Sequence, residues 1–449
     1  MLDSELSKTK KKTTVLDKAF AINLESVDES LASSQALEAF NPDSVQQDIR
    51  SSFGKPGYND GKIGTHPDFK HLAQTENQEN HYICSLFLDI KNSTRLTFLY
   101  DLEEVVAIKN TILKAAAESV LAMDGHVHRF MGDALLAFFG GKHVEKDDSI
   151  VNALNCASVL ESIMTGTIIP VLKQKYPGSQ DTDHLGFRIG LDYGSNEDVL
   201  WSSYGFRGVY EVTPTSFYVD VAAKLQSIAG KNKSMLGQSI IEEIDLPDDY
   251  TSTRIRTQTN AEGKQETIQV PTLPRTYTDR FGKAIRYKVR ELNHAKYRDL
   301  LPFPPDLKEA HPNSLVVACT GVTFQCFIES EGQLIPYLSV SRPLGKHLKL
   351  RFKVTLGKEV HEAHSFPLEL KLTKRNYGRE AQLKEQKGVY EVSRSTVIRD
   401  HGYTSAYFRA IPFWHNDSTA YRGLHTMEAE IRDASKSVIF RDIIGVYIK

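Results

Sequence analysis

Apolar residues along the first 300 positions follow two spacings, and each spacing predicts a different kind of element. Short runs in which almost every residue is apolar are typical of buried strands, whereas apolar residues three and four apart are typical of helices. The first spacing predicts strands at residues 82–89, 126–139 (a hairpin) and 187–193. The second predicts helical segments at residues 103–123, 148–164, 168–175 and 219–229. Strands separated by helices around a central hairpin predict an α+β, ferredoxin-like core.

The stretches that flank these elements have weaker patterns. Residues 1–13 are polar, and residues 14–40 have a helical spacing of apolar positions that Asp and Ser interrupt. Residues 41–79 contain the turn-rich sequence GKPGYNDGKIG, which predicts a linker or an irregular arm. Residues 201–211, WSSYGFRGVYE, are expected to form a loop whose aromatic side chains pack, with stacking on a base as the alternative.

The pattern changes beyond residue 300. Residues 301–312, LPFPPDLKEAHP, are rich in proline and are typical of a boundary between domains. Beyond them, apolar residues occupy every second position at residues 348–356 and 366–372. This alternation predicts an all-β module, a sandwich. The expected units are residues 1–79 (tail, helical arm and linker), 80–300 (α+β core) and 310–449 (all-β domain).

Bulk composition limits the classes of protein to which the chain can belong. Its 449 residues are 40% apolar, which suffices for ordinary cores in two or three domains. The formal net charge of −2 gives no reason to expect nucleic-acid binding, and no apolar run reaches the roughly 18–20 residues of a membrane helix. Four cysteines without metal-ligand spacing indicate buried thiols in a reducing compartment: Cys84, Cys156, Cys319 and Cys326. We therefore expect a soluble cytoplasmic protein that binds neither nucleic acid nor membrane.

Two of the predicted strands carry a carboxylate at their polar end. Asp89 lies in the run SLFLDIKNSTRL, and Asp133 stands at the polar break of HRFMGDALLAFF. Burying a carboxylate at such a position is costly unless a cation or strong donors compensate it. Two carboxylates offer the oxygen ligands that Mg²⁺ or Mn²⁺ prefer, and such ions can hold a triphosphate. A turn cap is the alternative role for either aspartate alone.

Four motifs resemble those of class III nucleotidyl cyclases, in the order and at about the spacing of that family. Residues 87–94, FLDIKNST, resemble the strand and turn F-x-D-I-x-x-[ST]-T, and residues 128–139, HRFMGDALLAFF, resemble the K-x-x-G-D hairpin. Residues 187–194, FRIGLDYG, resemble the strand R-I-G-[IL]-H-x-G, and residues 218–225, YVDVAAKL, resemble the helix V-N-x-A-x-R-L. The resemblance covers residues 82–292. It implies an enzyme that cyclises a nucleoside triphosphate and releases diphosphate.

The resemblance implies roles for the residues of the first two motifs. Asp89 and Asp133 would bind two divalent metal ions, Mn²⁺ or Mg²⁺, with the backbone carbonyl of Ile90 helping one of them. The turn after Ile90 offers backbone N–H groups that could cradle the β- and γ-phosphates, and a plain polar turn is the alternative. The residues of this turn are Asn92, Ser93 and Thr94.

Two further positions of the family stabilise the transition state, and this chain departs from the family at both. The family has an asparagine that orients the ribose where this chain has Asp220, and an arginine on the phosphate where this chain has Lys224. Lysine keeps the charge but loses the forked geometry of arginine, so we expect a point charge on the α-phosphate. A spacing of four residues also allows a simple surface ion pair between Asp220 and Lys224.

The positions that read the base also differ from the purine cyclases. Adenylyl cyclases usually have lysine four residues before the hairpin aspartate and guanylyl cyclases have glutamate, whereas this chain has Arg129. A guanidinium only donates hydrogen bonds, which suits the adjacent acceptors O2 and N3 of cytosine. The second base-reading position is Thr213, which can donate or accept and does not enforce adenine. An exposed hairpin arginine is the alternative role for Arg129.

These departures resemble the pyrimidine cyclases of the Pycsar antiphage system, and the all-β tail resembles the AGS-C sensor domain. The resemblance implies a cytidylate cyclase that uses CTP to make cyclic CMP, a messenger for a separate effector protein. It also implies a homodimer with composite active sites, in which one subunit supplies Asp89 and Asp133 and the other supplies Arg129, Asp220 and Lys224. The alternatives are a uridylate cyclase that uses UTP, an adenylate cyclase, and an inactive cyclase fold that binds nucleotide.

Overall fold

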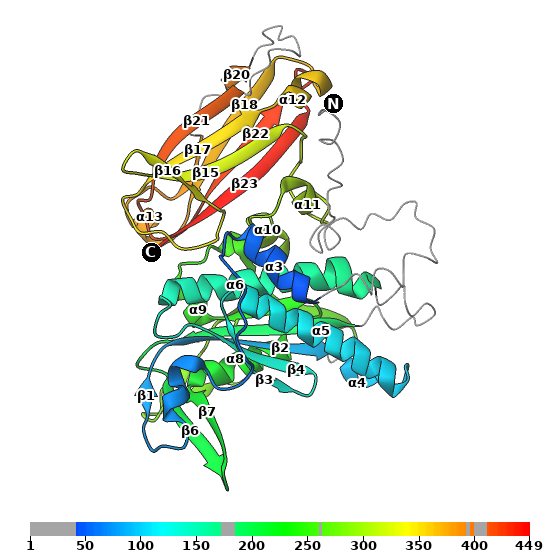
Figure 1. The fold of residues 1–449 in the computed structure, drawn as a ribbon, viewed down its shortest axis with the longest axis vertical. Coiled ribbons are helices and arrows are strands. Elements are labelled where there is room, and N and C mark those ends of the chain that lie inside the picture. Colours follow the sequence, from blue (N-terminus) through cyan, green and yellow to red (C-terminus); the bar gives the residue numbers. More distant parts are fainter. Residues whose placement is uncertain (1–41, 172–184, 260–262, 392–395, 399–410) are drawn as a thin grey trace, which may run out of the picture.

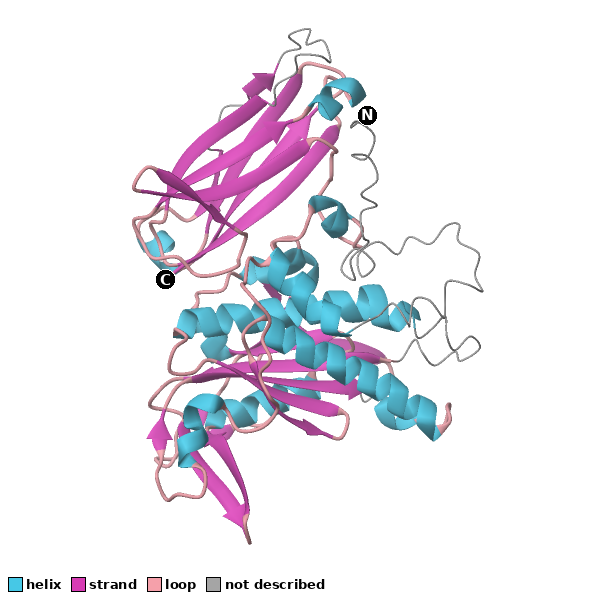
Figure 2. Cartoon of the chain, viewed as in Figure 1, coloured by secondary structure: helices cyan, strands magenta, loops and turns pink. Residues whose placement is uncertain are grey.

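A seven-stranded sheet forms the centre of the N-terminal part of the chain (Figures 1 and 2). The computed structural model describes residues 42–171, 185–259, 263–391, 396–398 and 411–449. The sheet has the order β3-β4-β2-β5-β8-β14-β9. Its strands are β2 (Ile83–Lys91), β3 (His126–Met131), β4 (Ala134–Phe139), β5 (Gly186–Gly194), β8 (Lys233–Gly237), β9 (Thr251–Ser252) and β14 (Val289–Leu292). β5 and β8 pair in parallel, and the other pairs are antiparallel.

The first four strands of this sheet and two long helices form a ferredoxin-like unit. The helices are α5 (Leu102–Ala122), which lies between β2 and β3, and α6 (Lys146–Ile163), which lies between β4 and β5. The chain order is therefore βαββαβ, and the strand order β3-β4-β2-β5 is the one expected for this fold. The α+β, ferredoxin-like core predicted from the sequence is confirmed. A short helix, α4 (Ser93–Leu96), follows β2 directly.

Helices cover both faces of the sheet (Figure 1). α5 and α6 lie on one face, and α8 (Phe217–Ile228) lies on the other, against β5. Gly190 of β5 allows this close approach, because a Cβ atom there would lie 2.1 Å from the carbonyl oxygen of Ala222 in α8. The Ser216 hydroxyl caps α8 by accepting a hydrogen bond from the backbone N–H of Tyr218. The remaining elements between β8 and β14 are α9 (Gln238–Glu243), η4 (Asp248–Tyr250) and the hairpins β10 (Arg254–Thr259)–β11 (Gln265–Val270) and β12 (Tyr277–Thr278)–β13 (Ala284–Ile285).

The expectation of a loop at residues 201–211 is wrong. This segment is most of a hairpin, β6 (Leu200–Phe206) and β7 (Val209–Thr215), which pairs with β1 (Glu79–Asn80) in a three-stranded sheet. Of its aromatic residues, Trp201 packs as expected: its ring is fully buried and stacks on Phe69 at 3.9 Å between centroids, whereas Tyr204, Phe206 and Tyr210 are exposed. The tip of the hairpin extends away from the rest of the molecule (Figure 1).

The expectation that residues 41–79 form an irregular arm is only partly correct. They contain helix α3 (Pro42–Ser52) and the 3-10 helix η1 (Pro67–Leu72). The helical pattern at residues 14–40 lies outside the described residues. Helix α6 continues into a π-helical turn at Met164–Ile168, and the predicted segment at residues 168–175 extends beyond the described residues at 172.

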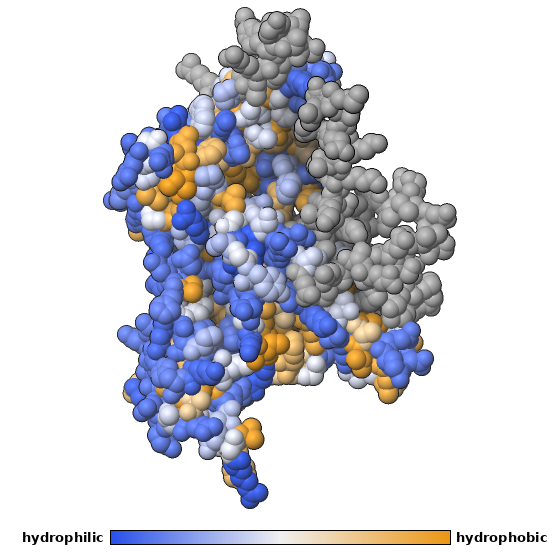
Figure 3. All heavy atoms as spheres, in the orientation of Figure 1, coloured by the Kyte–Doolittle hydropathy of each residue, from blue (hydrophilic) through white to orange (hydrophobic). Residues whose placement is uncertain are grey.

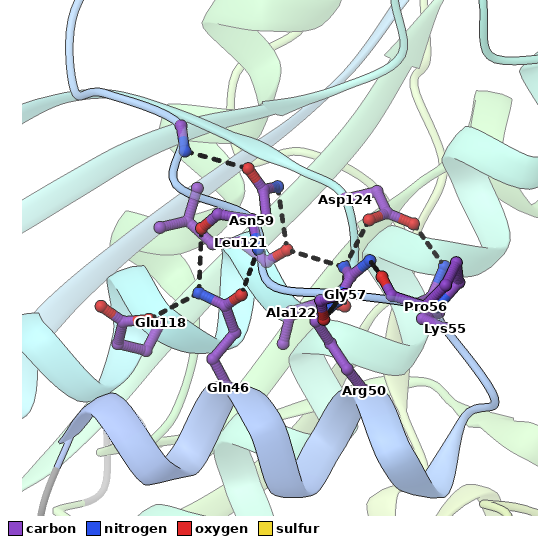
Figure 4. A network of polar contacts seen from close by, with 11 residues as sticks. Gln46, Arg50, Lys55, Pro56, Gly57, Asn59, Glu118, Leu121, Ala122 and Asp124 are labelled. Carbon is purple, nitrogen blue, oxygen red and sulfur yellow. Dashed lines mark hydrogen bonds and ion pairs between the residues drawn. The ribbon is translucent and has the colours of Figure 1, made fainter.

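Helix α3 is held on α5 by a polar network around Arg50 (Figure 4). The guanidinium of Arg50 donates to the carbonyl of Ala122, at 3.2 Å, and forms an ion pair with Asp124 at 2.5 Å. Gln46 donates to the Glu118 carboxylate at 2.8 Å. Because the last carbonyls of a helix have no partner within the helix, Arg50 satisfies groups that would otherwise need water.

The C-terminal part is a β sandwich (Figure 2). One sheet has the order β16-β15-β17-β21 and the other β19-β18-β22-β23, with β20 paired to β18. Apolar residues of both sheets form one cluster between them, so the predicted sandwich is confirmed. The strands are β15 (Val322–Ser330), β16 (Gln333–Tyr337), β17 (Lys349–Leu356), β18 (Leu368–Asn376), β19 (Gly388–Glu391), β20 (Thr396–Ile398), β21 (Ile411–Ser418), β22 (Gly423–Arg432) and β23 (Val438–Ile448). Short helices α12 (Lys358–Ala363) and α13 (Arg379–Leu383) connect strands.

The sandwich is attached to α6 through buried polar contacts. Helices α10 (His294–Arg298) and α11 (Pro305–Glu309) lie at the junction (Figure 1). Asn155 of α6 donates to the Val340 carbonyl at 2.8 Å and accepts from the Tyr297 hydroxyl at 2.9 Å. Tyr447 of β23 donates to the Tyr297 hydroxyl at 3.2 Å. The two parts of the chain therefore pack around a shared core, and more than a flexible linker connects them.

One helical stretch of the described chain, Lys146–Val171, is long and apolar enough to cross a membrane by length and composition. Its apolar window is 72% buried within the molecule. That burial is typical of the core helix of a folded domain, and α6 packs here against β2, β4 and α5.

Candidate active site

Asp89 and Asp133 lie on adjacent strands, at the same edge of the central sheet. Asp89 stands in β2 opposite Ala134, the first residue of β4. Asp133 occupies the turn before β4, and its carbonyl accepts a hydrogen bond from the Ile90 N–H at 3.2 Å. Both side chains are half-buried. The strand pairing therefore places these two residues next to each other at this edge of the sheet.

Each of the two carboxylates has a partner within the chain. The Arg188 guanidinium in β5 lies opposite Asp89 and donates to its Oδ2, with Nε at 3.1 Å. The Ser93 hydroxyl donates to Oδ2 of Asp133. These contacts supply the cation and the donor that a half-buried carboxylate needs.

The turn after β2 has the backbone conformation of a tight turn. Asn92 has a φ of 62°, in the left-handed region that Asn tolerates better than most residues. Helix α4 begins at the next residue, Ser93, whose side chain is buried and faces Asp133. Thr94 is exposed. Ser93 is thus committed to supporting the carboxylate, while Asn92 and Thr94 stay open to solvent.

Asp220 and Lys224 lie on an exposed face of α8, one turn apart. The Lys224 ammonium does not pair with the Asp220 carboxylate: it lies 3.4 Å from the carbonyl oxygen of Asp220. It also lies 5.7 Å from the centre of the Tyr277 ring, and the Arg275 guanidinium lies at the same distance from that ring. The ion pair proposed as the alternative role of this pair is therefore wrong for the described structure.

Arg129 in β3 is paired to an acidic residue that the sequence did not indicate. Its guanidinium forms an ion pair with Glu211 of β7, which also contacts Nε2 of His128 at 2.6 Å. Thr213 follows Glu211 on the same face of β7, because alternate residues of a strand point to the same side. The structure therefore brings Arg129 and Thr213 to one region, as the base-reading hypothesis requires.

The site residues form two groups within one chain. Among the described residues, no hydrogen bond or ion pair joins Asp89 or Asp133 to Arg129, Asp220 or Lys224. Arg188, which pairs with Asp89, also donates to the Ser227 carbonyl of α8 at 3.3 Å, so the first group lies near the end of the helix that carries Lys224.

Three side chains near the site were missed at the sequence level. Arg188 lies inside the motif FRIGLDYG, and its position opposite Asp89 follows only from the strand register. Tyr277, beside Lys224, lies in a poorly patterned segment. Glu211 has no sequence signal, because its partner Arg129 is distant in the chain.

Asp192 in β5 occupies the position where the family motif has histidine. Its carboxylate is fully buried and accepts hydrogen bonds from the Ser239 hydroxyl at 2.5 Å and the Tyr287 hydroxyl at 2.8 Å. Burial raises the pKa of Asp192 to about 7, against the opposing effect of these donors. A Cβ at Gly237 would collide with Asp192, so this glycine makes room for the carboxyl group.

Comparison with known proteins assigns both parts of the chain. Residues 305–449 match the family described as "Adenylyl/Guanylyl and SMODS C-terminal sensor domain". A cytidylate cyclase of Escherichia coli is 37% identical over 418 residues, covering 90% of this chain and 87% of that protein. A cytidylate cyclase of Staphylococcus aureus is 34% identical and covers the same shares of the two chains.

The protein is a class III nucleotide cyclase with a C-terminal sensor domain, and it belongs to the cytidylate cyclase family. The resemblance inferred from the four motifs is thereby confirmed. The solved structure of the adenylyl cyclase CyaB from P. aeruginosa is similar over 48% of this chain and 95% of that chain, with 18% identity and a TM-score of 0.35.

Proposed function

We propose that the protein converts CTP into 3′,5′-cyclic CMP and diphosphate, and that cyclic CMP signals to a separate effector protein in antiphage defence. Relatives named cytidylate cyclase cover about nine-tenths of the chain, which supports CTP as the substrate. The observation that carries the proposal is the meeting of Asp89 and Asp133 at one edge of the sheet. We expect the protein to act in the cytoplasm.

The carboxylate pair fits two divalent metal ions, Mn²⁺ or Mg²⁺. Carboxylate and backbone carbonyl oxygens are the ligands that these ions prefer, and Asp89, Asp133 and the Ile90 carbonyl supply them. The described residues contain no cluster of three or more His, Cys, Asp or Glu side chains suited to a metal. The other ligands would therefore come from the triphosphate and water. When bound, the ions would lower the pKa of the ribose 3′-hydroxyl and neutralise phosphate charge.

The remaining site residues would position the triphosphate. A metal ion at Asp89 would compete with Arg188 for the carboxylate, which would free the guanidinium for the phosphates. Lys224 would place a charge at the α-phosphate, where negative charge builds up as the ribose oxygen attacks. Asp220 would accept from a ribose hydroxyl. Asn92, Ser93 and Thr94 would offer backbone N–H groups to the β- and γ-phosphates.

The active enzyme would be a homodimer with composite sites. Large apolar side chains are exposed around α4, the start of α5 and the β3–β4 turn: Phe98, Leu102, Val106, Phe130 and Met131. Figure 3 shows hydrophobic surface at the end of the molecule that carries α4. Such a patch is typical of an interface with another chain. It adjoins Asp133, so a second copy bound there would bring its Arg129 and Lys224 toward the metal carboxylates.

The composite site can be tested by mixing two inactive variants. Asp89→Ala removes a metal ligand and Lys224→Ala removes the phosphate charge, so each homodimer should be inactive or slow. In a mixed dimer one of the two sites contains neither substitution, and co-expression should restore up to about half of the wild-type turnover per mixed dimer. No recovery of cyclic product in verified mixed dimers would contradict the shared site.

A further inference from the structure

Glu211 and Arg129 present a carboxylate and a guanidinium side by side at the region assigned to the base. Their side chains are 38% and 39% exposed, so both remain accessible to a ligand. Nε2 of His128 lies 2.6 Å from the Glu211 carboxylate and 3.3 Å from the Arg129 guanidinium, so both members of the pair rest against this ring. The His128 side chain is only 1% exposed, and its other ring nitrogen lies 3.0 Å from the Gly64 carbonyl. The pair therefore packs against the buried His128 on one side and is exposed to solvent on the other.

Hydrogen-bond chemistry lets this pair separate the two pyrimidines. Along its pairing edge, cytosine offers the N4 amino group as a donor and then N3 and O2 as acceptors. Uracil offers the acceptor O4, the donor N3–H and the acceptor O2. A carboxylate only accepts and a guanidinium only donates. Cytosine therefore satisfies both groups, whereas uracil would place O4 against the carboxylate and N3–H against the guanidinium.

Thr213, the other residue in the base-reading region, cannot distinguish cytosine from uracil. Thr213 lies two residues beyond Glu211 on the same face of β7, but its hydroxyl can either donate or accept. Arg129 alone could still donate to O2 of either base. When the base covers this pair, a mismatch of two acceptors is penalised more strongly than a missing hydrogen bond, so the carboxylate adds most of the discrimination.

We propose that Glu211 is a specificity-determining residue of the cyclase: its carboxylate accepts a hydrogen bond from the cytosine N4 amino group while Arg129 donates to N3 and O2. This inference rests on the proposed conversion of CTP and names the group that selects CTP over UTP. Size rather than this pair would have to exclude the purines, because adenine also offers an amino group beside a ring acceptor.

The test is the ratio of kcat/KM for CTP to kcat/KM for UTP in the Glu211→Gln variant of the full-length protein. Glutamine has the same shape but can donate as well as accept, so it can serve O4 and N3–H of uracil. The ratio should fall about ten- to hundredfold, mainly through a gain with UTP and a loss with CTP. The matched control is Glu79→Gln. Glu79 lies in β1 of the same three-stranded sheet and also contacts a cation, Lys142 at 2.7 Å, and a histidine, His71 at 3.1 Å. The ratio of kcat/KM for CTP to kcat/KM for UTP should stay unchanged in Glu79→Gln.

A substrate analogue gives a second measurement, which starts from the wild-type enzyme. Pyrimidin-2-one ribonucleoside triphosphate has hydrogen in place of the N4 amino group. The wild-type enzyme should use it about tenfold or more less efficiently than CTP, and Glu211→Ala should reduce that difference. Equal losses on all substrates in Glu211→Gln, with an unchanged ratio, would make Glu211 a structural support for Arg129 and overturn the inference. Failure of the wild-type enzyme to cyclise CTP would instead overturn the proposed function itself.

Discussion

At the edge of the sheet that carries Asp89 and Asp133, single residues have both a structural partner and a proposed chemical role. Asp133 accepts from the Ser93 hydroxyl, and Asp89 is paired with Arg188. Removing Asp89 would leave a half-buried guanidinium without its partner, so a loss of activity in that variant would mix chemistry with stability. Asp133 allows a cleaner substitution, because an amide oxygen can still accept from Ser93.

We expect Asp133→Asn to lower kcat with CTP by about a thousandfold or more, because a metal contribution of several kcal/mol is lost. The thermal midpoint should change little, since the hydrogen bond from Ser93 persists. The control is Asp198→Asn, which also replaces a carboxylate that accepts from a serine hydroxyl, at 2.6 Å from Ser195. Steady-state cyclisation in Mn²⁺ measures both variants. Turnover of Asp133→Asn within tenfold of wild type would remove the metal role from Asp133.

Arg129 and Lys224 should affect different steps. Arg129→Ala should weaken the preference for CTP over ATP about ten- to hundredfold, because it removes a charged hydrogen bond to the base. Lys224→Ala should lower turnover on every triphosphate alike, because it touches the phosphate. Measuring kcat/KM for four ribonucleoside triphosphates separates the two patterns. Uniform losses in Arg129→Ala would assign that residue to phosphate binding or to structure.

At the scale of elements, the sequence predicted the strands and helices with strong periodicity and missed those that depend on distant partners. β2, the β3–β4 hairpin and α5 begin and end within two residues of their predicted bounds, because their apolar spacing is continuous. The β6–β7 hairpin and α3 were missed because their stability comes from other elements. The hairpin depends on the stacking of Trp201 on Phe69, and α3 depends on the hydrogen bonds of Arg50 to the end of α5.

The same distinction holds for the site. Asp89 and Asp133 could be predicted because each lies at the polar end of an apolar run. Glu211 and Arg188 could not, since their pairing depends on which strands become neighbours.

Arg50 tests how firmly the N-terminal arm supports the core. Arg50→Ala should lower the free energy of unfolding by about 2–4 kcal/mol, because the carbonyls at the end of α5 lose a buried charged donor. Lys55→Ala removes the 2.8 Å ion pair with the partly exposed Asp124 but leaves the carbonyls of α5 paired, so it should cost less than Arg50→Ala, about 1 kcal/mol. Urea unfolding measures both. Equal costs for the two variants would show that Arg50 does not stabilise α5.

At the scale of the whole molecule, buried titrating groups set the response to acid. Burial lowers the pKa of His66 to about 4, and burial followed by nearby cations lowers the pKa of His294 and His311 to about 3. The unfolded chain takes up these protons near pH 6.5, whereas the folded chain does not, so stability falls as pH drops below about 6.5. Asp192 acts in the opposite direction: its folded pKa of about 7 means that the folded chain gains a proton between pH 7 and about 4.

We therefore expect the free energy of unfolding to decrease as the pH falls from 6 to 4.5, because these three histidines, opposed by Asp192, together contribute up to about 2–3 kcal/mol per pH unit. Asp192→Asn removes the opposing group and should steepen this decrease. Urea unfolding over that pH range measures both slopes. A wild-type slope near zero, or an unchanged slope in Asp192→Asn, would contradict the assignment of these groups.

The most direct measurement of the central claim is competition among substrates. Purified full-length protein is incubated with Mn²⁺ and equal concentrations of ATP, GTP, CTP and UTP, with Asp133→Asn as the blank, and the cyclic products are identified by mass. We predict 3′,5′-cyclic CMP as the main product, with an equal amount of diphosphate released. Cyclic UMP, cyclic AMP or cyclic GMP as the main product, or no cyclic product at all, would contradict this account of the protein.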